Sequence, residues 1–304
     1  MSNQQPKFNN EKSTIIRKVI DLFLYSNIYI AAAAVALTWQ TQLILFDEFE
    51  LDALSILVFF ATMFIYASHR LVGLFSVKKF LKEGRFHIIN TYKNHIWIYT
   101  GIALIGLAYA FFQVSFRIQL ALIIPGLVSL GYVIPFLGFQ KNRKLRLRDL
   151  NWIKIFLIAV VWGYVTVILP IVEIRSVHWS DALIFIERMV FIFMITLPFD
   201  IRDLKVDQYN NVKTIPAVYG ISFTMKLVLI SLIFLLLLIS VNYLFVPESP
   251  IYFATYGLWL SLISTYIFIR ISIDKTDDYY FTGLLDGTMW LQFVCVWCFN
   301  WLLS

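Results

Sequence analysis

Charged residues are scarce in this chain. Of its 304 residues, 14% are charged and 60% are hydrophobic, and the mean hydropathy is +0.76. A soluble domain contains roughly 25% charged and 45–50% apolar residues. The shortage of charge excludes an ordinary soluble protein. We therefore expect a membrane protein that crosses the bilayer many times and has no separate soluble domain.

Cysteine is nearly absent as well. The two cysteines, Cys295 and Cys298, both lie in the last hydrophobic segment. A C-x-x-C pair can bind a metal or carry out redox chemistry. Here no second pair and no polar flanking residues accompany it, so we expect two packing residues. The net charge of +6 does not indicate a nucleic-acid partner, because the basic residues are confined to particular loops.

Long hydrophobic runs make up most of the chain. About nine of them approach the roughly 20 residues that a helix needs to cross the bilayer core. They cover residues 20–46, 52–76, 94–114, 117–138, 151–172, 182–201, 221–246, 250–271 and 281–303. The pattern predicts an all-α, polytopic membrane protein of about nine transmembrane helices around a central cavity. We expect a cytoplasmic tail over residues 1–19 and a single transmembrane domain over residues 20–304.

The distribution of lysine and arginine predicts the orientation. If the N-terminus is cytoplasmic, 22 of the 25 basic residues fall in the tail or in loops on the cytoplasmic side. The exceptions are Arg117 and Arg175 outside and Arg188 within the sixth span. Cytoplasmic loops of membrane proteins carry such an excess of positive charge. We therefore expect a multi-pass protein with its N-terminus in the cytoplasm, its C-terminus outside and its working loops on the cytoplasmic side.

A polar stretch after the sixth span contains the strongest candidate site. Asp200, Asp203 and Asp207 are spaced i, i+3 and i+7, which places them on one face if the helix continues. Carboxylates at the end of an apolar helix need a cation, and hard oxygen ligands suit Mg²⁺ shared with phosphate oxygens. Arg202, Lys205 and Lys213 could hold the phosphate charge. The alternative is a solvated loop whose charges simply balance.

This stretch resembles the second aspartate-rich motif of the UbiA superfamily of intramembrane prenyltransferases. The matching residues are Pro198-Phe199-Asp200-Ile201-Arg202-Asp203-Leu204-Lys205-Val206-Asp207, Lys213-Thr214-Ile215-Pro216 and Gly220. The resemblance implies a prenyl diphosphate and an aromatic or other lipophilic acceptor as substrates. It also implies Mg²⁺ held by Asp200, Asp203 and Asp207, with Lys213, Arg202 and Arg70 stabilising the diphosphate that leaves.

The family's other acidic motif, N-D-x-x-D after the second span, is missing. Residues 65–74 contain no carboxylate. If Arg70 corresponds to the arginine that often follows the family's motif, Tyr66 and His69 stand in place of the two aspartates. Two interpretations remain open. Arg70 and a protonated His69 could replace a metal by fixed positive charge, or the site could have lost its ionising power and bind a lipid or diphosphate without catalysis. A metal-free cluster of ion pairs between the second and sixth spans is a related alternative.

The end of the fourth span supplies two further candidates. Tyr132 begins a Y-x-x-P sequence, and the basic loop that follows includes Lys144. Their resemblance to the family is short. We expect Tyr132 and Lys144 to contribute to substrate binding. The alternative for the loop is a topology signal that contacts anionic lipid headgroups.

A carboxylate inside the last span is the remaining candidate. Asp286 either forms hydrogen bonds as a packing residue or faces the cavity, where it could pair with Arg70 or position the acceptor. At the start of the fifth span, Asp149, Asn151 and Lys154 could line the same cavity.

The sequence as a whole predicts a prenyltransferase of UbiA type that works within the membrane among its lipids. The main alternative is a non-catalytic protein of the same fold that binds a lipid or diphosphate. A transporter is a further alternative, although no interrupted helices in repeated halves are visible. A CDP-alcohol phosphotransferase is disfavoured because its Asp-Gly and Ala-Arg elements are missing from the acidic stretch.

Overall fold

The computed structural model describes residues 15–76, 84–134, 137–140, 143–151, 153–210, 212–244, 254–275 and 277–303. Within these residues the α-helices are α1 Ile15–Tyr25, α2 Ile28–Phe46, α3 Ala53–Ser76, α4 Gly84–Thr91, α5 Lys93–Gln113, α6 Phe116–Ala121, α7 Ile123–Val133, α8 Ile153–Gly163, α9 Leu169–Ile174, α10 Asp181–Arg202, α11 Leu204–Tyr209, α12 Ile215–Leu244, α13 Ala254–Ser272 and α14 Gly287–Leu303. The other elements are β1 Leu137–Gln140, β2 Arg143–Leu145, a short 3₁₀ helix η2 Leu147–Asp149, and two π-helical segments, η3 Tyr164–Ile168 and η4 Tyr280–Leu285.

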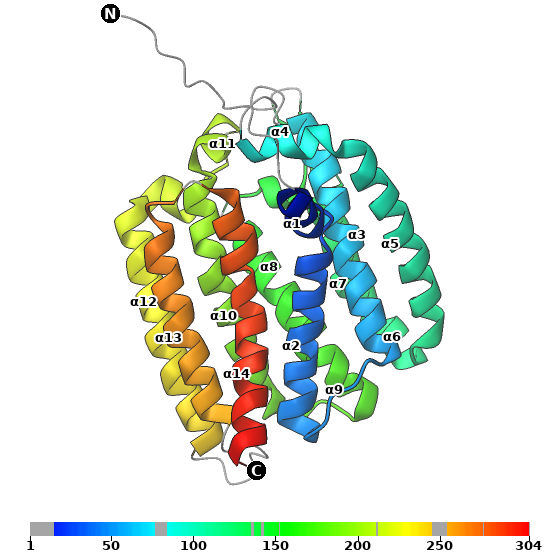
Figure 1. The fold of residues 1–304 in the computed structure, drawn as a ribbon, viewed down its shortest axis with the longest axis vertical. Coiled ribbons are helices and arrows are strands. Elements are labelled where there is room, and N and C mark those ends of the chain that lie inside the picture. Colours follow the sequence, from blue (N-terminus) through cyan, green and yellow to red (C-terminus); the bar gives the residue numbers. More distant parts are fainter. Residues whose placement is uncertain are drawn as a thin grey trace, which may run out of the picture.

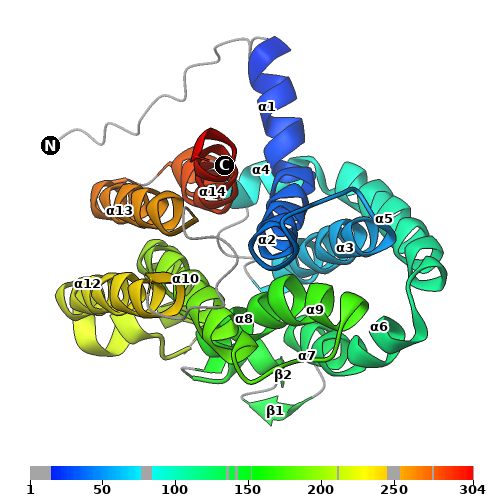
Figure 2. The same ribbon diagram turned by 90° about the horizontal axis from the view of Figure 1, so that it is seen from below.

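The long helices run side by side along the longest axis of the molecule (Figure 1). Viewed from one end, they form a ring (Figure 2). Contacts follow the order α2, α3, α7, α8, α10, α13 and α14, and α14 packs back on α2. Helix α5 covers α3 from outside, and α12 covers α10 and α13. The predicted all-α, polytopic fold is confirmed.

Seven helical segments among the described residues are long and apolar enough to cross a membrane. Two other predicted spans correspond to shorter elements, namely the α6–α7 pair and α14 with its preceding η4 segment. Large apolar side chains face outward along the bundle, including Ile105 and Phe112, which are 73% and 77% exposed. Such surfaces are stable in lipid rather than in water. The chain is an integral, multi-pass membrane protein.

The first predicted span, 20–46, is wrong as a single helix. Helix α1 ends at Tyr25, and α2 begins at Ile28. Between them Asn27 has φ 68°, a left-handed conformation that ends a helix. Asparagine tolerates this conformation better than most residues do. As a result α1 extends away from the axis of α2 at the end of the bundle that also carries α4 and α11 (Figures 1 and 2).

The π-helical segment η3 interrupts the fifth span. It separates α8 from α9, and Pro170, which has no backbone N–H, follows it in the first turn of α9. Helix α12 is bent at Gly220, where φ is 81°. The loop after α7 forms a small antiparallel hairpin in which β1 pairs with β2. This hairpin is the one β-structure among the described residues and adds to the predicted helical fold.

A buried polar cluster fastens α10 to α12 in the half of the bundle that lies away from α11. The Glu187 carboxylate accepts hydrogen bonds from the Asn242 amide at 3.0 Å and the Tyr243 hydroxyl at 3.2 Å. Arg188 donates to the Leu37 carbonyl of α2 at 3.2 Å. Since buried polar groups are costly unless hydrogen-bonded, these contacts fix how the three helices meet.

Candidate functional site

A cavity of about 340 Å³ lies inside the helix ring, near the end that carries α4 and α11. The candidate residues from the sequence that line it are Tyr66, His69, Arg70, Tyr132, Asp149, Lys154, Asp200, Arg202, Asp203, Asp207 and Asp286. The charged side chains come mostly from the ends of the helices. Further along the same helices the wall becomes apolar, with Ile65 of α3 and Val161 and Trp162 of α8. The cavity therefore joins a charged end to an apolar interior.

Two predicted site residues are not among those that line the cavity. Lys213 is exposed, and its backbone N–H donates to the Asn151 side-chain oxygen at 2.9 Å. Lys144 belongs to β2, and its side chain lies outside the described part of the chain. Their proposed roles in holding diphosphate remain predictions.

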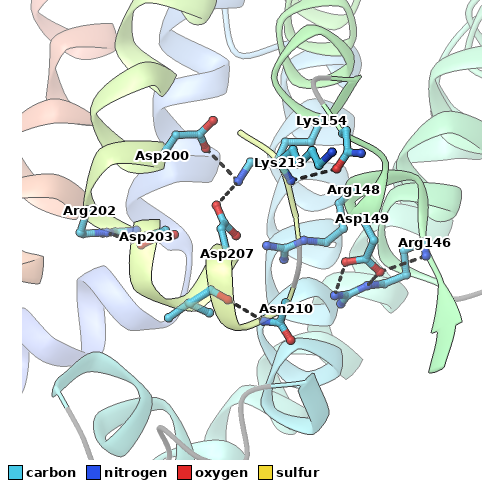
Figure 3. A network of polar contacts seen from close by, with 12 residues as sticks. Arg146, Arg148, Asp149, Lys154, Asp200, Arg202, Asp203, Asp207, Asn210 and Lys213 are labelled. Atoms are coloured by element: carbon cyan, nitrogen blue, oxygen red, sulfur yellow. Dashed lines mark hydrogen bonds and ion pairs between the residues drawn. The ribbon is translucent and has the colours of Figure 1, made fainter. Parts of the chain in front are cut away.

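The centre of the charged end is a lysine between two aspartates (Figure 3). Lys154 Nζ lies 2.8 Å from Asp200 Oδ1 and 2.9 Å from Asp207 Oδ2. All three residues are buried, with exposed fractions of 7%, 3% and 5%. An unpaired buried charge costs several kcal/mol, so the ammonium and the carboxylates stabilise one another. The lysine comes from the first turn of α8, and the aspartates come from the end of α10 and from α11.

The three aspartates do not share one helix face, in contrast to the expectation from their spacing. Helix α10 ends at Arg202, and Asp203 has φ −89° and ψ 3°, outside the helical region. A new helix, α11, begins at Leu204. This break turns Asp207 back toward Asp200, so both carboxylates reach Lys154, while Asp203 points toward Arg202 (Figure 3).

Arg202 forms a second cluster on the same wall. Its Nε lies 3.0 Å from Asp203 Oδ1, and its Nη1 lies 2.6 Å from Asp278 Oδ1. The guanidinium also lies over two rings, 5.0 Å from the centre of Phe199 and 4.9 Å from that of Phe281. Arginine suits this position because a planar guanidinium can donate in two directions and stack on aromatic faces. The side chain is therefore held firmly at the cavity wall.

Asp278 links this cluster to α1. The Tyr25 hydroxyl donates to Asp278 Oδ2 at 3.0 Å. Burial, with a further contribution from the negative charge of Asp278, raises the pKa of the Tyr25 phenol well above its usual value. The phenol therefore keeps its proton and remains a donor. Helix α1, whose first residues were predicted to belong to the cytoplasmic tail, therefore contacts the wall of the cavity through this hydrogen bond.

Helix α3 supplies the wall where the first acidic motif is missing. His69 Nε2 contacts Arg148 Nη1, which comes from the segment between the hairpin and α8. The Tyr132 ring lies beside both, with its centre 5.7 Å from that of the His69 ring and 5.8 Å from the Arg148 guanidinium carbon. Tyr66 lies edge-on to Trp162, with ring centres 6.3 Å apart. Aromatic and cationic groups occupy this wall instead of carboxylates.

Arg70 connects the same wall to α1. Its Nη1 donates to the Tyr25 carbonyl at 2.8 Å, and its guanidinium carbon lies 5.2 Å from the centre of the Tyr25 ring. The carbonyl is available because α1 ends at Tyr25. Arg70 therefore contributes positive charge to the cavity and also caps the C-terminal end of α1 by binding the Tyr25 carbonyl.

Asp286 also lines the cavity, at the junction between η4 and α14. Among the described residues, no side chain donates a hydrogen bond to its carboxylate. The neighbouring Tyr29 hydroxyl instead donates to the Gly283 carbonyl at 2.8 Å. A carboxylate in this position is available to a molecule in the cavity, either as a hydrogen-bond acceptor or as a proton acceptor.

The charges of the cavity nearly cancel. Its cationic side chains are Arg70, Arg146, Arg148, Lys154 and Arg202, and its carboxylates are Asp149, Asp200, Asp203, Asp207, Asp278 and Asp286. Several are matched in pairs, as for Arg146, which binds both oxygens of Asp149 at 3.1 Å. An incoming anion would therefore compete with these carboxylates for hydrogen bonds from the cations.

The predicted set of Mg²⁺ ligands does not assemble in this arrangement. Asp200 and Asp207 share Lys154, and Asp203 faces Arg202. Across the part of the chain that the structure describes, no group of three or more His, Cys, Asp or Glu residues could hold a metal ion. The ammonium takes the space between the carboxylates where a metal would have to lie, so these residues as placed do not fit Mg²⁺.

Two residues at the charged end of the cavity were not predicted as site residues from the sequence. From the sequence, Lys154 was expected only to line the cavity, and Asp278 was not singled out. A lysine near the end of an apolar helix usually reaches toward the membrane surface, and a carboxylate in a loop is usually solvated. The available signal for Lys154 was its position as the second residue of a strongly apolar segment, Ile153–Ile174.

Comparisons with known proteins were made by sequence and by structure. No protein-family model matches the sequence, and no curated protein matches it. The fold is nevertheless similar to solved structures. A UbiA homologue from Archaeoglobus fulgidus bound to GPP and Mg²⁺ matches with a TM-score of 0.65 at 10% identity, covering 92% of this chain and 99% of that one.

Two further structures give the same result. The A. fulgidus homologue bound to DMAPP and Mg²⁺ matches with a TM-score of 0.63 at 11% identity, over 91% of this chain and 98% of the other. A structure described for digeranylgeranylglyceryl phosphate synthase in membranes matches with a TM-score of 0.55 at 12% identity, over 92% and 96% of the two chains. Identities this low establish shared architecture only, and the chain has the same fold as these UbiA homologues.

Proposed function

We propose that this protein transfers a prenyl group from a prenyl diphosphate to a lipophilic acceptor within the membrane. The observation that carries the proposal is the cavity, which has basic side chains at one end and an apolar interior beyond them. A prenyl diphosphate has the matching form, an anionic head on a hydrocarbon chain. The solved proteins of the same fold that were bound to GPP or DMAPP support this choice of substrate class.

In this proposal the cationic side chains hold the diphosphate. Arg148, Lys154 and Arg202 would donate to phosphate oxygens, with Arg70 adding positive charge from α3. Charge-assisted hydrogen bonds of this kind are strong. The aspartates that now bind Lys154 and Arg202 would orient these cations. Binding would therefore use N–H donors of these cations that the aspartates leave over, such as the third N–H of Lys154.

The reaction itself is a substitution at the first carbon of the prenyl chain. The carbon–oxygen bond breaks, and its electron pair leaves with the diphosphate. The resulting allylic cation would lie against the rings of Tyr66, Tyr132 and Trp162, whose faces stabilise positive charge. A nucleophilic atom of the acceptor then supplies the electron pair for the new bond. Asp286 would accept the proton that the acceptor loses.

The orientation predicted from the sequence belongs to this proposal. The charged end of the cavity would face the cytoplasm, where soluble diphosphates are available. Modification of single cysteines by an impermeant reagent in intact cells tests this. A cysteine placed at exposed Lys205 should be protected, and one placed at Trp179, which is 83% exposed near the other end, should react.

Non-catalytic binding of a lipid or diphosphate remains the second candidate function. The near balance of charge in the cavity and the aromatic and cationic wall at Tyr66, His69 and Arg70 favour it. The deciding assay uses purified protein in nanodiscs with labelled geranyl or dimethylallyl diphosphate, candidate acceptors, and buffers with and without Mg²⁺. Acceptor-dependent release of diphosphate supports transfer. Saturable binding without release supports the second function. A role for Mg²⁺ in this chain is still a prediction, and the same assay measures it.

A further inference from the structure

The Lys154 ammonium lies at the meeting point of two carboxylates that come from different helices. Its Nζ is 2.8 Å from Asp200 Oδ1 and 2.9 Å from Asp207 Oδ2. The side chains of the three residues are 5% to 9% exposed. An ammonium has three N–H donors. Two are directed to these carboxylates, and among the described residues no other side chain accepts from the third.

We infer that Lys154 is a built-in replacement for a divalent cation at the Asp200–Asp207 pair, so that this pair binds no Mg²⁺ in the native protein. Mg²⁺ binds oxygen at about 2.0–2.1 Å in an octahedron and keeps several water ligands. An ammonium centred between the same two oxygens occupies that volume. A metal could therefore bind there only if Lys154 left the site.

Departure of Lys154 would be costly because of where the residue is attached. It is the second residue of α8, and α8 packs along α10, the helix that carries Asp200. The residue is 7% exposed. Moving the ammonium to another place would leave either a buried positive charge or two buried negative charges without a partner. The positive charge between the two carboxylates therefore belongs to the chain itself, and no metal ion from solution is needed to supply it.

The opposite wall of the cavity provides an independent observation. Residues 65–74 of α3 contain no Asp or Glu, and the polar side chains that this stretch presents to the cavity include His69 and Arg70. A divalent ion would find no carboxylate on that wall. Both sides of the charged end therefore rely on cationic side chains. The third N–H of Lys154 is left to donate to an anionic oxygen in the cavity.

Metal binding can be measured without any prenyl substrate, so the result does not depend on whether the protein catalyses transfer. Mn²⁺ serves as the probe in electron paramagnetic resonance titrations of the full-length protein in nanodiscs. We expect Mn²⁺ binding to be the same in the native protein, in Asp200→Asn and in Asp207→Asn, because the native pair of aspartates binds no metal. A native site that disappears in either variant would overturn the inference.

The converse test removes the lysine. Lys154→Met keeps an unbranched side chain but removes the ammonium and frees the carboxylates, and we expect it to gain one Mn²⁺ site at least tenfold tighter than any in the native protein. Mg²⁺ should raise the thermal midpoint of Lys154→Met and leave that of the native protein unchanged. Adding Asp207→Asn to Lys154→Met should abolish both effects. The control is Lys205→Met, which replaces an exposed lysine of α11.

A folded Lys154→Met protein that gains no Mn²⁺ site would contradict the inference. If Lys154→Met does not fold, Lys154→Gln is the second variant and carries the same expectation, because an amide supplies no positive charge. The comparison of the native protein with Asp200→Asn and Asp207→Asn decides the question in either case.

Discussion

Lys154 of α8 and Asp207 of α11 are 53 residues apart in sequence and 2.9 Å apart in the folded protein. Their contact joins the two segments that border the charged end of the cavity, and Asp200 completes it from α10. The break in the helix at Asp203 makes the contact possible. The stability of the site and its chemistry therefore depend on the same three side chains.

Removal of the Lys154 charge should destabilise the protein strongly. In the absence of divalent ions, Lys154→Met leaves two buried carboxylates without a counter-charge, and we expect the free energy of unfolding to fall by about 3–5 kcal/mol. Reversible unfolding in mixed micelles measures the change. Lys205→Met should alter it by less than about 0.5 kcal/mol, because that side chain is exposed. Similar losses in the two variants would show that the ion pairs contribute little.

Arg202→Lys should weaken the binding of prenyl diphosphate. A lysine cannot donate to Asp203 and Asp278 in the same forked geometry or stack on Phe199 and Phe281. We expect an affinity loss of about tenfold, equivalent to roughly 1.5 kcal/mol for a hydrogen bond to a charged group. Equilibrium binding of labelled geranyl diphosphate measures it.

A matched control for this substitution lies at the other end of the bundle. Arg175 also forms an ion pair, with its Nη2 2.7 Å from Asp181 Oδ1, but it is not among the residues that line the cavity. Arg175→Lys should leave the affinity unchanged. An equal loss in both variants would indicate a general effect on the fold rather than on the site.

Asp286→Asn should separate catalysis from binding. The amide keeps the shape of the carboxylate but cannot accept a proton from the acceptor. We expect acceptor-dependent turnover to fall by about 10²–10⁴-fold, while the affinity for prenyl diphosphate changes by less than threefold. Product formation and ligand binding are measured on the same preparation. Unchanged turnover would remove Asp286 from the proposed reaction.

Gly220→Ala should be destabilising although space is available for the added carbon. A Cβ at Gly220 would meet no atom within 4 Å, but φ is 81°, which favours glycine. The strain should cost about 1–2 kcal/mol. Gly101→Ala in α5 is the control, because its Cβ would also meet no atom within 4 Å and its φ does not lie in the positive range. That change should be neutral or stabilising by up to about 1 kcal/mol. Equal effects would contradict the conformational explanation.

Much of this fold could be predicted because lipid imposes simple rules on sequence. The positions of the membrane spans could be predicted from the runs of apolar residues. Asp200 and Asp286 could be recognised as functional candidates because carboxylates are rare in membrane helices. The breaks at Asn27 and Asp203 could not be predicted in this way. Neither position contains proline or glycine. Tertiary contacts, such as those made by Lys154, decide where the chain turns.

The residues that line the cavity were predicted better than the ion pairs that form between them. Tyr66, His69, Arg70 and Tyr132 do line the cavity, as their positions near span ends suggested. The partner of Asp200 was expected to be a metal or Arg70. The lysine that binds it comes from another helix, and spacing within one segment carries no information about such a contact.

The most direct test of the central claim is to locate a bound prenyl diphosphate in the protein. A photoreactive analogue of geranyl diphosphate, with the reactive group on the hydrocarbon chain, is cross-linked in nanodiscs and mapped by mass spectrometry. The account predicts labelling of the apolar cavity wall around Ile65 and Val161, suppressed by excess geranyl diphosphate. Labelling confined to outward-facing residues such as Ile105 and Phe112, and insensitive to competitor, would contradict it.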